Sequence, residues 1–302
     1  MGTISRALGR FELETPYLTM TRVPRIAHFV FGFREQLEPF QLLHYLAIES
    51  CRRILQPERI YLHYHHLPFG VFWDEIRPHL TLARVDLVQE VLEARYDERL
   101  VPEEYRYAHH ADFVRLDALV EHGGVYVDMD TIFVRPLPDA LYGEKFVIGR
   151  EPAVVDEITG KARPSMCNAL MMAEPESVFA RTWRARMAAA INGTWSNHSG
   201  FLAQTLSEEL PDEVRVEPEE SFFAVPCTPA GLAALLEHGP LDLSRSYSVH
   251  LWEHLWWSID RMDFSPRHSR EMSVANLQTS RSPLAELVRQ YLPNIDVDDI
   301  RT

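Results

Sequence analysis

Two aspartates, Asp128 and Asp130, interrupt the otherwise apolar segment VYVDMDTIF. Residues two apart on an extended strand point to the same side, so the spacing predicts two carboxylates that face one way. A strand rich in Val, Tyr, Ile and Phe gives no packing reason for two acids. Paired carboxylates are hard oxygen ligands that suit Mg²⁺ or Mn²⁺. The segment therefore predicts half of a divalent-metal site, against the alternative of two solvated acids without a role.

The segment before these aspartates carries a second charged pair, Asp112 and Arg115, which share one face of a predicted helix. An exposed helical ion pair worth less than about 1 kcal/mol is one interpretation. In the other, Arg115 binds a phosphate or sugar oxygen and Asp112 accepts hydrogen bonds from hydroxyls. Carboxylates and phosphate repel each other, so a cation must lie between them. The ligand that suits both pairs is a diphosphate attached to a hydroxyl-rich group.

The stretch ADFVRLDALVEHGGVYVDMDTIFVRPL resembles the DXD region of family 32 glycosyltransferases and of the catalytic domain of large clostridial glucosylating toxins. The family pattern has an Asp, an Arg three residues on, a Tyr eleven further, and then Asp-x-Asp. Its positions are filled by Asp112, Arg115, Tyr126, Asp128 and Asp130. The resemblance implies a GT-A fold and retaining, metal-dependent transfer of a hexose from a UDP- or GDP-sugar to an acceptor hydroxyl, in polysaccharide or glycoconjugate biosynthesis.

Weaker resemblances lie on both sides of this stretch. Phe31, in RIAHFVFG, stands where many relatives have a Trp that stacks on the nucleotide base, and Asn168, in NALMMAEP, matches an Asn that approaches the transferred sugar. HLWEHLWW resembles the family's closing segment, in which His250 would bind the metal or diphosphate and Trp252, with Trp256 or Trp257, would close over the donor. Each residue also has a plain alternative as a packed core or strand-end side chain.

The resemblance thus implies three overlapping sets of residues. The metal set, for Mn²⁺ or Mg²⁺, is Asp128, Asp130 and His250. The nucleotide-sugar set is Phe31, Asp112, Arg115, Tyr126, Asp128 and Trp252. The catalytic set is Asp112, Arg115, Asp130 and Asn168. The other histidines, including His109 and His110, have no spacing that demands a metal.

No residue is placed by the sequence as an obvious covalent nucleophile, which favours front-face attack with the leaving phosphate helping to deprotonate the acceptor. Two other functions stay open. DMDT resembles the start of haloacid-dehalogenase-type phosphatases, although Thr131 directly follows Asp130 where that motif has one more residue. The alternative to both enzymes is a non-catalytic nucleotide-sugar binder on the same fold.

The elements that must position these residues alternate between strands and helices. Strands are expected at 25–33, 58–66, 82–88, 125–137 and 167–175, with shorter ones around Val214 and Phe222. Helices are expected at 40–55, 109–122, 176–191, 200–210 and 282–292. This alternation predicts an α/β fold with a Rossmann-like, mainly parallel sheet, flanking helices and helical C-terminal additions. We expect a single domain over 1–302, with a loose leader (1–22), a nucleotide-sugar-binding half (23–150) and an acceptor-side half (151–302).

Composition limits the partners. The chain has 302 residues and 30 Lys+Arg against 44 Asp+Glu, a net charge of −14, which disfavours nucleic-acid binding. Three cysteines make no disulfide framework, and neither a signal peptide nor a transmembrane segment is visible, so a cytoplasmic protein is expected. The expected partners are a nucleotide sugar and a glycan, lipid-linked or small-molecule acceptor, with peripheral membrane contact left open. Because the donor is also an anion, the acidic chain predicts strict metal dependence.

Overall fold

The protein is described from a computed structural model, which covers residues 21–96, 99, 101, 103–237, 241–256 and 271–295. Residues 1–20 of the expected leader and Trp257 lie outside the described residues. No helix in the described ranges combines the length and apolar character that crossing a membrane requires.

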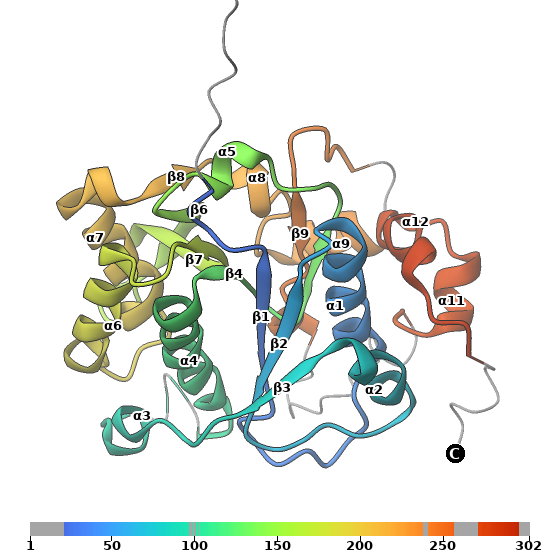
Figure 1. Cartoon of the computed structure of the whole chain (residues 1–302), viewed down its shortest axis with the longest axis horizontal. Helices are drawn as coiled ribbons and strands as arrows, with labels where there is room; N and C mark the ends of the chain where they lie inside the picture. The colour runs from blue at the N-terminus through green and yellow to red at the C-terminus, as the bar shows by residue number, and fades with distance from the viewer. Residues whose placement is uncertain are drawn as a thin grey trace, which may run out of the picture.

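A seven-stranded sheet forms the centre of the molecule (Figure 1). Its order is β3-β2-β1-β4-β7-β6-β8. Neighbours β3/β2, β2/β1, β1/β4 and β6/β8 are parallel, whereas β7 runs antiparallel to β4 and β6. The strands are β1 (Ile26–Phe31), β2 (Arg59–Tyr64), β3 (Thr81–Arg84), β4 (Gly124–Val127), β6 (Phe146–Val155), β7 (Ala162–Ala173) and β8 (Arg215–Glu217). The predicted α/β fold with a mainly parallel sheet is confirmed.

Helices cover both faces of this sheet. One hydrophobic cluster contains residues of α1 (Leu42–Ile54), α2 (Val71–Ile76), α5 (Asp139–Tyr142), α8 (Glu219–Phe222), α9 (Pro229–Leu236), α11 (Val274–Thr279) and α12 (Pro283–Val288). The other contains residues of α3 (Gln89–Glu93), α4 (Tyr107–His122), α6 (Val178–Ala190) and α7 (Leu202–Glu209). Helices α6 and α7 lie at one end of the molecule and α11 and α12 at the other (Figure 1). The helical C-terminal additions expected from the sequence are present.

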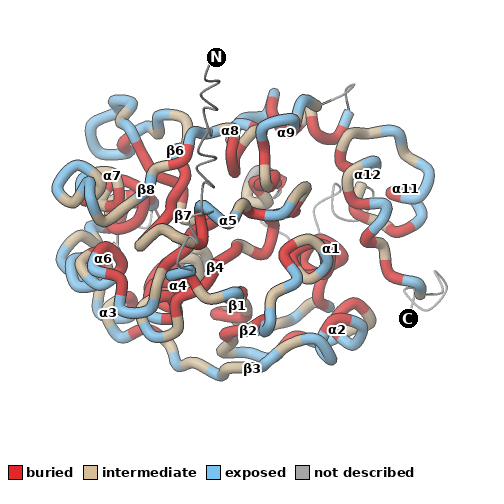
Figure 2. Tube along the Cα trace, turned by 45° about the horizontal axis from the view of Figure 1, so that its top comes forward, coloured by how far each residue is buried: buried red, intermediate tan, exposed pale blue. Residues whose placement is uncertain are grey.

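Strand β4 shows how the sheet separates the two clusters. Val125 and Val127 belong to the cluster with α1, whereas Tyr126 between them belongs to the cluster with α4. This alternation follows from the two-residue repeat of a strand. Burial is concentrated in the central strands, and edge strand β3 has no fully buried residue (Figure 2). Tyr126 therefore faces the helix that carries Asp112 and Arg115.

The expected Gly-Gly turn connects α4 to β4. Gly123 and Gly124 have φ angles of 64° and 99°, which side chains with a Cβ rarely adopt. A Cβ on Gly124 would lie 2.7 Å from the carbonyl oxygen of Ile26, and one on Gly123 would lie 2.8 Å from that of Ala173. Glycine at both positions lets α4 return closely against the sheet, which brings its charged pair to the end of β4.

Two local predictions are wrong. The 125–137 segment is not one strand, because β4 ends at Val127 and β5 (Thr131–Phe133) leaves the main sheet to pair with β9 (Ser248–His250). Asp128 and Asp130 lie in the turn between them, where the amide of Thr131 donates to the carbonyl oxygen of Asp128 at 3.1 Å. Phe222, expected in a strand, ends the short helix α8. Because they lie in a turn, Asp128 and Asp130 can contact different parts of the protein. On one face of a single strand they would share the same surroundings.

Candidate functional site

A cavity of about 590 Å³ lies where β1 and β4 end. The carboxyl ends of parallel strands are the usual binding edge of an open α/β sheet. Trp256, also expected to close over the donor, does not line this cavity, but the nine residues of the three predicted sets all do: Phe31, Asp112, Arg115, Tyr126, Asp128, Asp130, Asn168, His250 and Trp252. The fold thus brings together residues that are more than 200 positions apart in the chain.

Arg115 is the centre of the first group of polar contacts. It lies 3.2 Å from a carboxylate oxygen of Asp112 and 3.2 Å from one of Asp128, and it donates to the carbonyl oxygen of Asn168 at 2.8 Å. Its guanidinium carbon lies 4.5 Å from the centre of the Tyr126 ring. Although burial opposes its charge, the two carboxylates and the tyrosine raise the pKa of Arg115 further. One buried cation therefore holds two carboxylates, from α4 and from the turn after β4.

Asp112 is held from several directions. Its Oδ1 accepts from the Asn168 amide at 2.8 Å as well as facing Arg115, and its Oδ2 lies 2.9 Å from Nε2 of His198. Burial favours the neutral acid, but Arg115 and the hydrogen bond with His198 outweigh it and lower the pKa of Asp112 to about 2. Asp112 is therefore a fixed, ionised acceptor at the cavity wall.

Asp130 forms a second network with the C-terminal part of the chain. Its Oδ1 lies 2.9 Å from Nε2 of His250, and its Oδ2 accepts from the amide of Glu253 at 2.8 Å. Burial opposes ionisation of Asp130, yet His250 lowers its pKa, while Asp130 in turn raises the pKa of His250 against burial. The pairing of β5 with β9 supplies this contact, since Thr131 and His250 are register partners.

Asp128 lies between the two groups. Its Oδ1 accepts from the Tyr126 hydroxyl at 2.5 Å, and its side chain is 24% exposed, toward the cavity. Burial raises the pKa of Asp128, and although Arg115 lowers it, the nearby Asp130 carboxylate raises it again. Among the three aspartates, Asp128 is therefore the one whose negative charge its neighbours compensate least.

The chemistry of this donor set fits a divalent metal. One ligand atom each from Asp128, Asp130 and His250 can be chosen so that all lie within 4.8 Å of one another. Two carboxylates and an imidazole suit Mn²⁺ or Mg²⁺, and a cation between them would relieve the repulsion that raises the pKa of Asp128. Nε2 of His250 lies 2.9 Å from Oδ1 of Asp130, whereas its Nδ1 is buried with no hydrogen-bond partner among the described residues.

Phe31 and Trp252 form the apolar parts of the lining. Phe31, at the end of β1, packs edge-on against Phe40 and His44, with ring centroids 5.1 and 4.9 Å apart. Trp252 is 5% exposed, donates its Nε1 hydrogen to the carbonyl oxygen of Val225, and lies with its ring centroid 4.2 Å from that of His250. Trp252 therefore supports His250 as well as lining the cavity.

The sequence did not reveal His198 or Glu151. His198 lies in a π-helical turn (Asn197–Phe201), 86 residues from the aspartate it contacts, and together with His109 and Asp112 it forms a second cluster with metal-ligand chemistry. Glu151 lines the cavity from β6 and bonds the Ser165 hydroxyl, and burial raises its pKa to about 7. No motif pointed to either residue, because their roles come from long-range packing.

Residues 78–147 match the glycosyltransferase sugar-binding region containing the DXD motif. That range holds the five residues of the Asp–Arg–Tyr–Asp-x-Asp pattern. This match confirms the resemblance to the DXD region of glycosyltransferases that the sequence predicted.

A protein of Cryptococcus neoformans var. grubii serotype A named glucan organizing enzyme 1 is 33% identical over 240 residues, which cover 77% of this chain. The chain spans 63% of the length of that relative. Similar solved structures include PaToxG glycosyltransferase (13% identity, 89% of this chain and 87% of that chain, TM-score 0.41) and GlyE of Streptococcus pneumoniae TIGR4 (15%, 92% and 62%, TM-score 0.47).

Proposed function

We propose that this protein is a metal-dependent, retaining GT-A hexosyltransferase that uses a UDP- or GDP-sugar and acts in polysaccharide or glycoconjugate biosynthesis. The observation that carries the proposal is the convergence of Asp128, Asp130 and His250 beside Arg115 in one cavity. The two carboxylates and the imidazole would bind a cation and the guanidinium would bind an anion, and the match to a DXD sugar-binding region supports this combination.

Each residue of the proposal has a task that its surroundings favour. Asp128, Asp130 and His250 would hold Mn²⁺ or Mg²⁺, which supplies Lewis-acid stabilisation of a leaving diphosphate. Arg115 shares the charge of the diphosphate or sugar oxygens because it is already fixed between two carboxylates. Asp112, ionised and held, accepts from a sugar hydroxyl, and Asn168 keeps its carboxylate in place.

The remaining residues complete the donor site. Phe31 stacks on the nucleotide base, Tyr126 orients Asp128, and Trp252 closes the cavity beside His250. Residues 23–150 supply most of the donor site and 151–302 the acceptor side. With no nucleophile assigned from the sequence, we propose front-face attack, with a donor phosphate oxygen taking the acceptor proton.

A glycan, lipid-linked or small-molecule acceptor fits a protein placed in the cytoplasm, with or without peripheral membrane contact. The name of the Cryptococcus relative concerns a glucan, which makes glucan oligosaccharides the first acceptors to test.

The experiment is a donor screen. UDP-glucose, UDP-galactose, UDP-N-acetylglucosamine and GDP-mannose are offered with Mn²⁺, and hydrolysis and thermal stabilisation are recorded with and without EDTA. We expect hydrolysis of one donor that EDTA abolishes. Stabilisation without turnover would favour a non-catalytic binder, and hydrolysis of p-nitrophenyl phosphate alone would favour a phosphatase. A glycosyl adduct trapped on a side chain would overturn front-face attack.

A further inference from the structure

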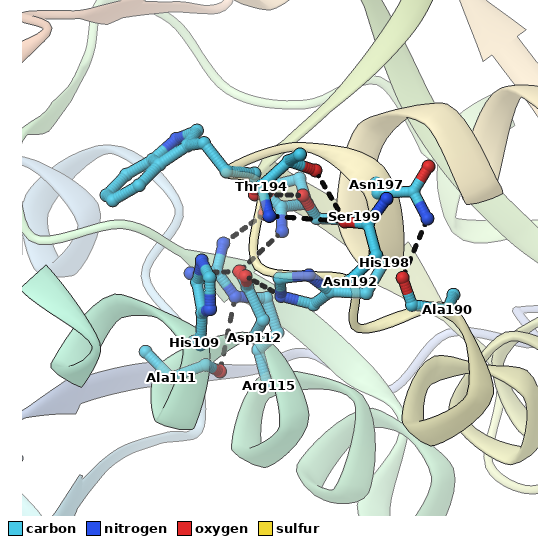
Figure 3. Close-up of polar contacts among 12 residues, drawn as sticks. His109, Ala111, Asp112, Arg115, Ala190, Asn192, Thr194, Asn197, His198 and Ser199 are labelled. Carbon is cyan, nitrogen blue, oxygen red and sulfur yellow. Dashed lines mark hydrogen bonds and ion pairs between the residues drawn. The ribbon is translucent and has the colours of Figure 1, made fainter. Parts of the chain in front are cut away.

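A buried histidine cluster lies behind the cavity wall. His109 and Asp112 point from α4 toward the loop after α6, which carries His198 (Figure 3). His109 and His198 are 1% and 0% exposed, and their rings pack at 70° with centroids 4.3 Å apart. Neither histidine lines the cavity, whereas Asp112 between them does. The cluster therefore reaches a ligand only through Asp112.

The hydrogen-bond pattern fixes the proton positions. The carboxyl of Asp112 is ionised, so Nε2 of His198 carries the hydrogen and donates to Oδ2 at 2.9 Å. The hydroxyl of Tyr96 lies 2.8 Å from Nδ1 of His109, and burial lowers the pKa of His109 to about 3, so this imidazole is neutral. His198 is thus held by a neutral neighbour and bonds one carboxylate oxygen.

Two polar atoms of the cluster have no partner. Nδ1 of His198 and Nε2 of His109 are buried without a hydrogen bond among the described residues. A buried, unsatisfied nitrogen costs stability that an apolar side chain of similar size would avoid. The imidazole of His198 therefore needs an explanation beyond packing, and its bond to Asp112 provides one.

That bond completes the restraint on the Asp112 carboxylate. Oδ1 faces both the Asn168 amide and the Arg115 guanidinium, whereas Oδ2 faces His198. Since each carboxylate oxygen offers about two acceptor directions, Oδ2 retains one direction for another donor. A sugar hydroxyl that bonds Asp112 must approach along this remaining direction.

We propose that His198 is a positioning residue that holds the Asp112 carboxylate so that it accepts from one particular hydroxyl of the donor hexose. The inference rests on the proposed function and deepens it. The π-helical turn (Asn197–Phe201) places His198 against Asp112, and the His198 carbonyl oxygen accepts from Nε1 of Trp183. The side-chain amide of Asn197 also holds this turn by donating to the carbonyl oxygen of Ala190 (Figure 3). Selection among hexose epimers then depends on a residue that never touches the sugar.

A metal bound by His109, Asp112 and His198 is the competing interpretation, because these residues can present ligand atoms within 4.8 Å of one another. Arg115 argues against it. Its guanidinium lies 3.2 Å from Asp112, so the negative charge that would attract a cation is already neutralised. At the cavity site Arg115 also lies 3.2 Å from Asp128, but Asp130 adds a second carboxylate beside the imidazole of His250.

The test compares donors that differ by one hydroxyl. Hydrolysis with Mn²⁺ is measured for UDP-glucose, UDP-galactose and GDP-mannose and for the 2-, 3-, 4- and 6-deoxy analogues of each. The variants are His198→Phe, which has no donor at this position, and His198→Gln, whose amide can replace Nε2. His63→Phe is the control, since His63 is 6% exposed and does not line the cavity.

For the donor preferred by the wild type, we expect His198→Phe to lower kcat/KM by about 10- to 100-fold, with the deoxy analogue lacking the recognised hydroxyl nearly unchanged. The ratio of kcat/KM between the preferred donor and its epimer should fall as well. His198→Gln should restore part of the kcat/KM and part of this ratio. Thermal stabilisation by UDP with Mn²⁺ should stay as in the wild type. If His198→Phe does not fold, His198→Leu is used in its place.

Three results would overturn the inference. Equal losses for parent and deoxy donors, or losses that His63→Phe reproduces, would leave His198 a structural residue only. Zn²⁺ binding by an Asp130→Asn protein that His198→Gln abolishes would establish the metal interpretation instead. If the wild type hydrolyses none of the donors, the proposed function itself fails and the inference falls with it, which distinguishes that case from the others.

Discussion

Two histidine–carboxylate pairs in this protein have the same geometry but different surroundings. His198 lies 2.9 Å from Asp112, and His250 lies 2.9 Å from Asp130. All four residues are buried, and each pair belongs to a three-residue cluster with metal-ligand chemistry. Neither the distance nor the burial of a pair therefore indicates what it does.

The neighbours make the difference. Beside the first pair, Arg115 neutralises Asp112 and a neutral histidine, His109, packs against His198. Beside the second, Asp128 adds a carboxylate, which raises the pKa of His250 together with Asp130 although burial opposes it. Because Arg115 neutralises Asp112, the His198–Asp112 pair is suited to holding a carboxylate in place. Because Asp128 adds negative charge, the His250–Asp130 pair is suited to binding a cation.

The largest expected effect contrasts the two aspartates. Asp130→Asn removes one carboxylate from the proposed metal set, and we expect Mn²⁺-dependent donor hydrolysis to fall on the order of 10³-fold. Thermal stabilisation by Mn²⁺ should disappear with it. Asp112→Asn should lower hydrolysis too, yet keep the stabilisation by Mn²⁺. If Asp130→Asn and Asp112→Asn lose the thermal stabilisation by Mn²⁺ equally, the idea that only the His250–Asp130 pair belongs to the metal site is wrong.

The second prediction removes the residue that separates the pairs. Arg115→Met keeps the length of the side chain but leaves the buried carboxylates of Asp112 and Asp128 uncompensated, which should cost about 3–5 kcal/mol of unfolding free energy. Urea denaturation measures this loss.

The matched control is Arg184, which bridges the carboxylates of Asp117 and Glu90 at the surface. Arg184→Met should cost less than about 1 kcal/mol, because solvent screens exposed ion pairs. If Arg115→Met and Arg184→Met lose similar unfolding free energy, the burial of Arg115 does not make its ion pairs more important for stability.

The third prediction uses pH. The folded pKa of Asp112 is about 2, below its usual 3.8, so its stabilisation is complete above about pH 4 and is lost as the pH falls through 2. The difference corresponds to about 2 kcal/mol at neutral pH. In urea denaturation, the gap between wild type and Asp112→Asn should narrow by about 1 kcal/mol between pH 6 and pH 3.

Asp117 provides a comparison of opposite sign. Partial desolvation raises the pKa of Asp117 although its side chain is 51% exposed, so the small stability that it contributes is present at low pH and is lost as the pH rises. The gap between wild type and Asp117→Asn should therefore change in the other direction over the same range. Parallel pH profiles for the two variants would contradict the assignment of an arginine-held, ionised Asp112.

The α/β class and the two charged pairs were predicted from local patterns, whereas Phe31, Asn168, His250 and Trp252 were named only because of the family resemblance. Strand–helix alternation, the Gly-Gly turn and the Asp–Arg–Tyr–Asp-x-Asp spacing can be read along the chain. The break between β4 and β5 could not, because Val, Tyr, Ile and Phe favour strand on both sides of the aspartates and only the pairing with β9 removes β5 from the main sheet. His198 and Glu151 reach the site through tertiary contacts, which leave no spacing to detect.

The smallest expected effect sharpens the description of Asp128, which lies between the two pairs. Tyr126→Phe removes a hydroxyl that donates to Oδ1 of Asp128 at 2.5 Å, and it should cost about 1–2 kcal/mol because the acceptor is a carboxyl oxygen of a side chain that is only 24% exposed. Tyr291→Phe is the control, since its hydroxyl donates at 3.3 Å to the neutral carbonyl of Phe133, and should cost about 0.5 kcal/mol. Because Mn²⁺ would bind Asp128 in the wild type and in Tyr126→Phe, it should narrow the difference in unfolding free energy between these two proteins. If Mn²⁺ leaves this difference unchanged, Asp128 is not a metal ligand.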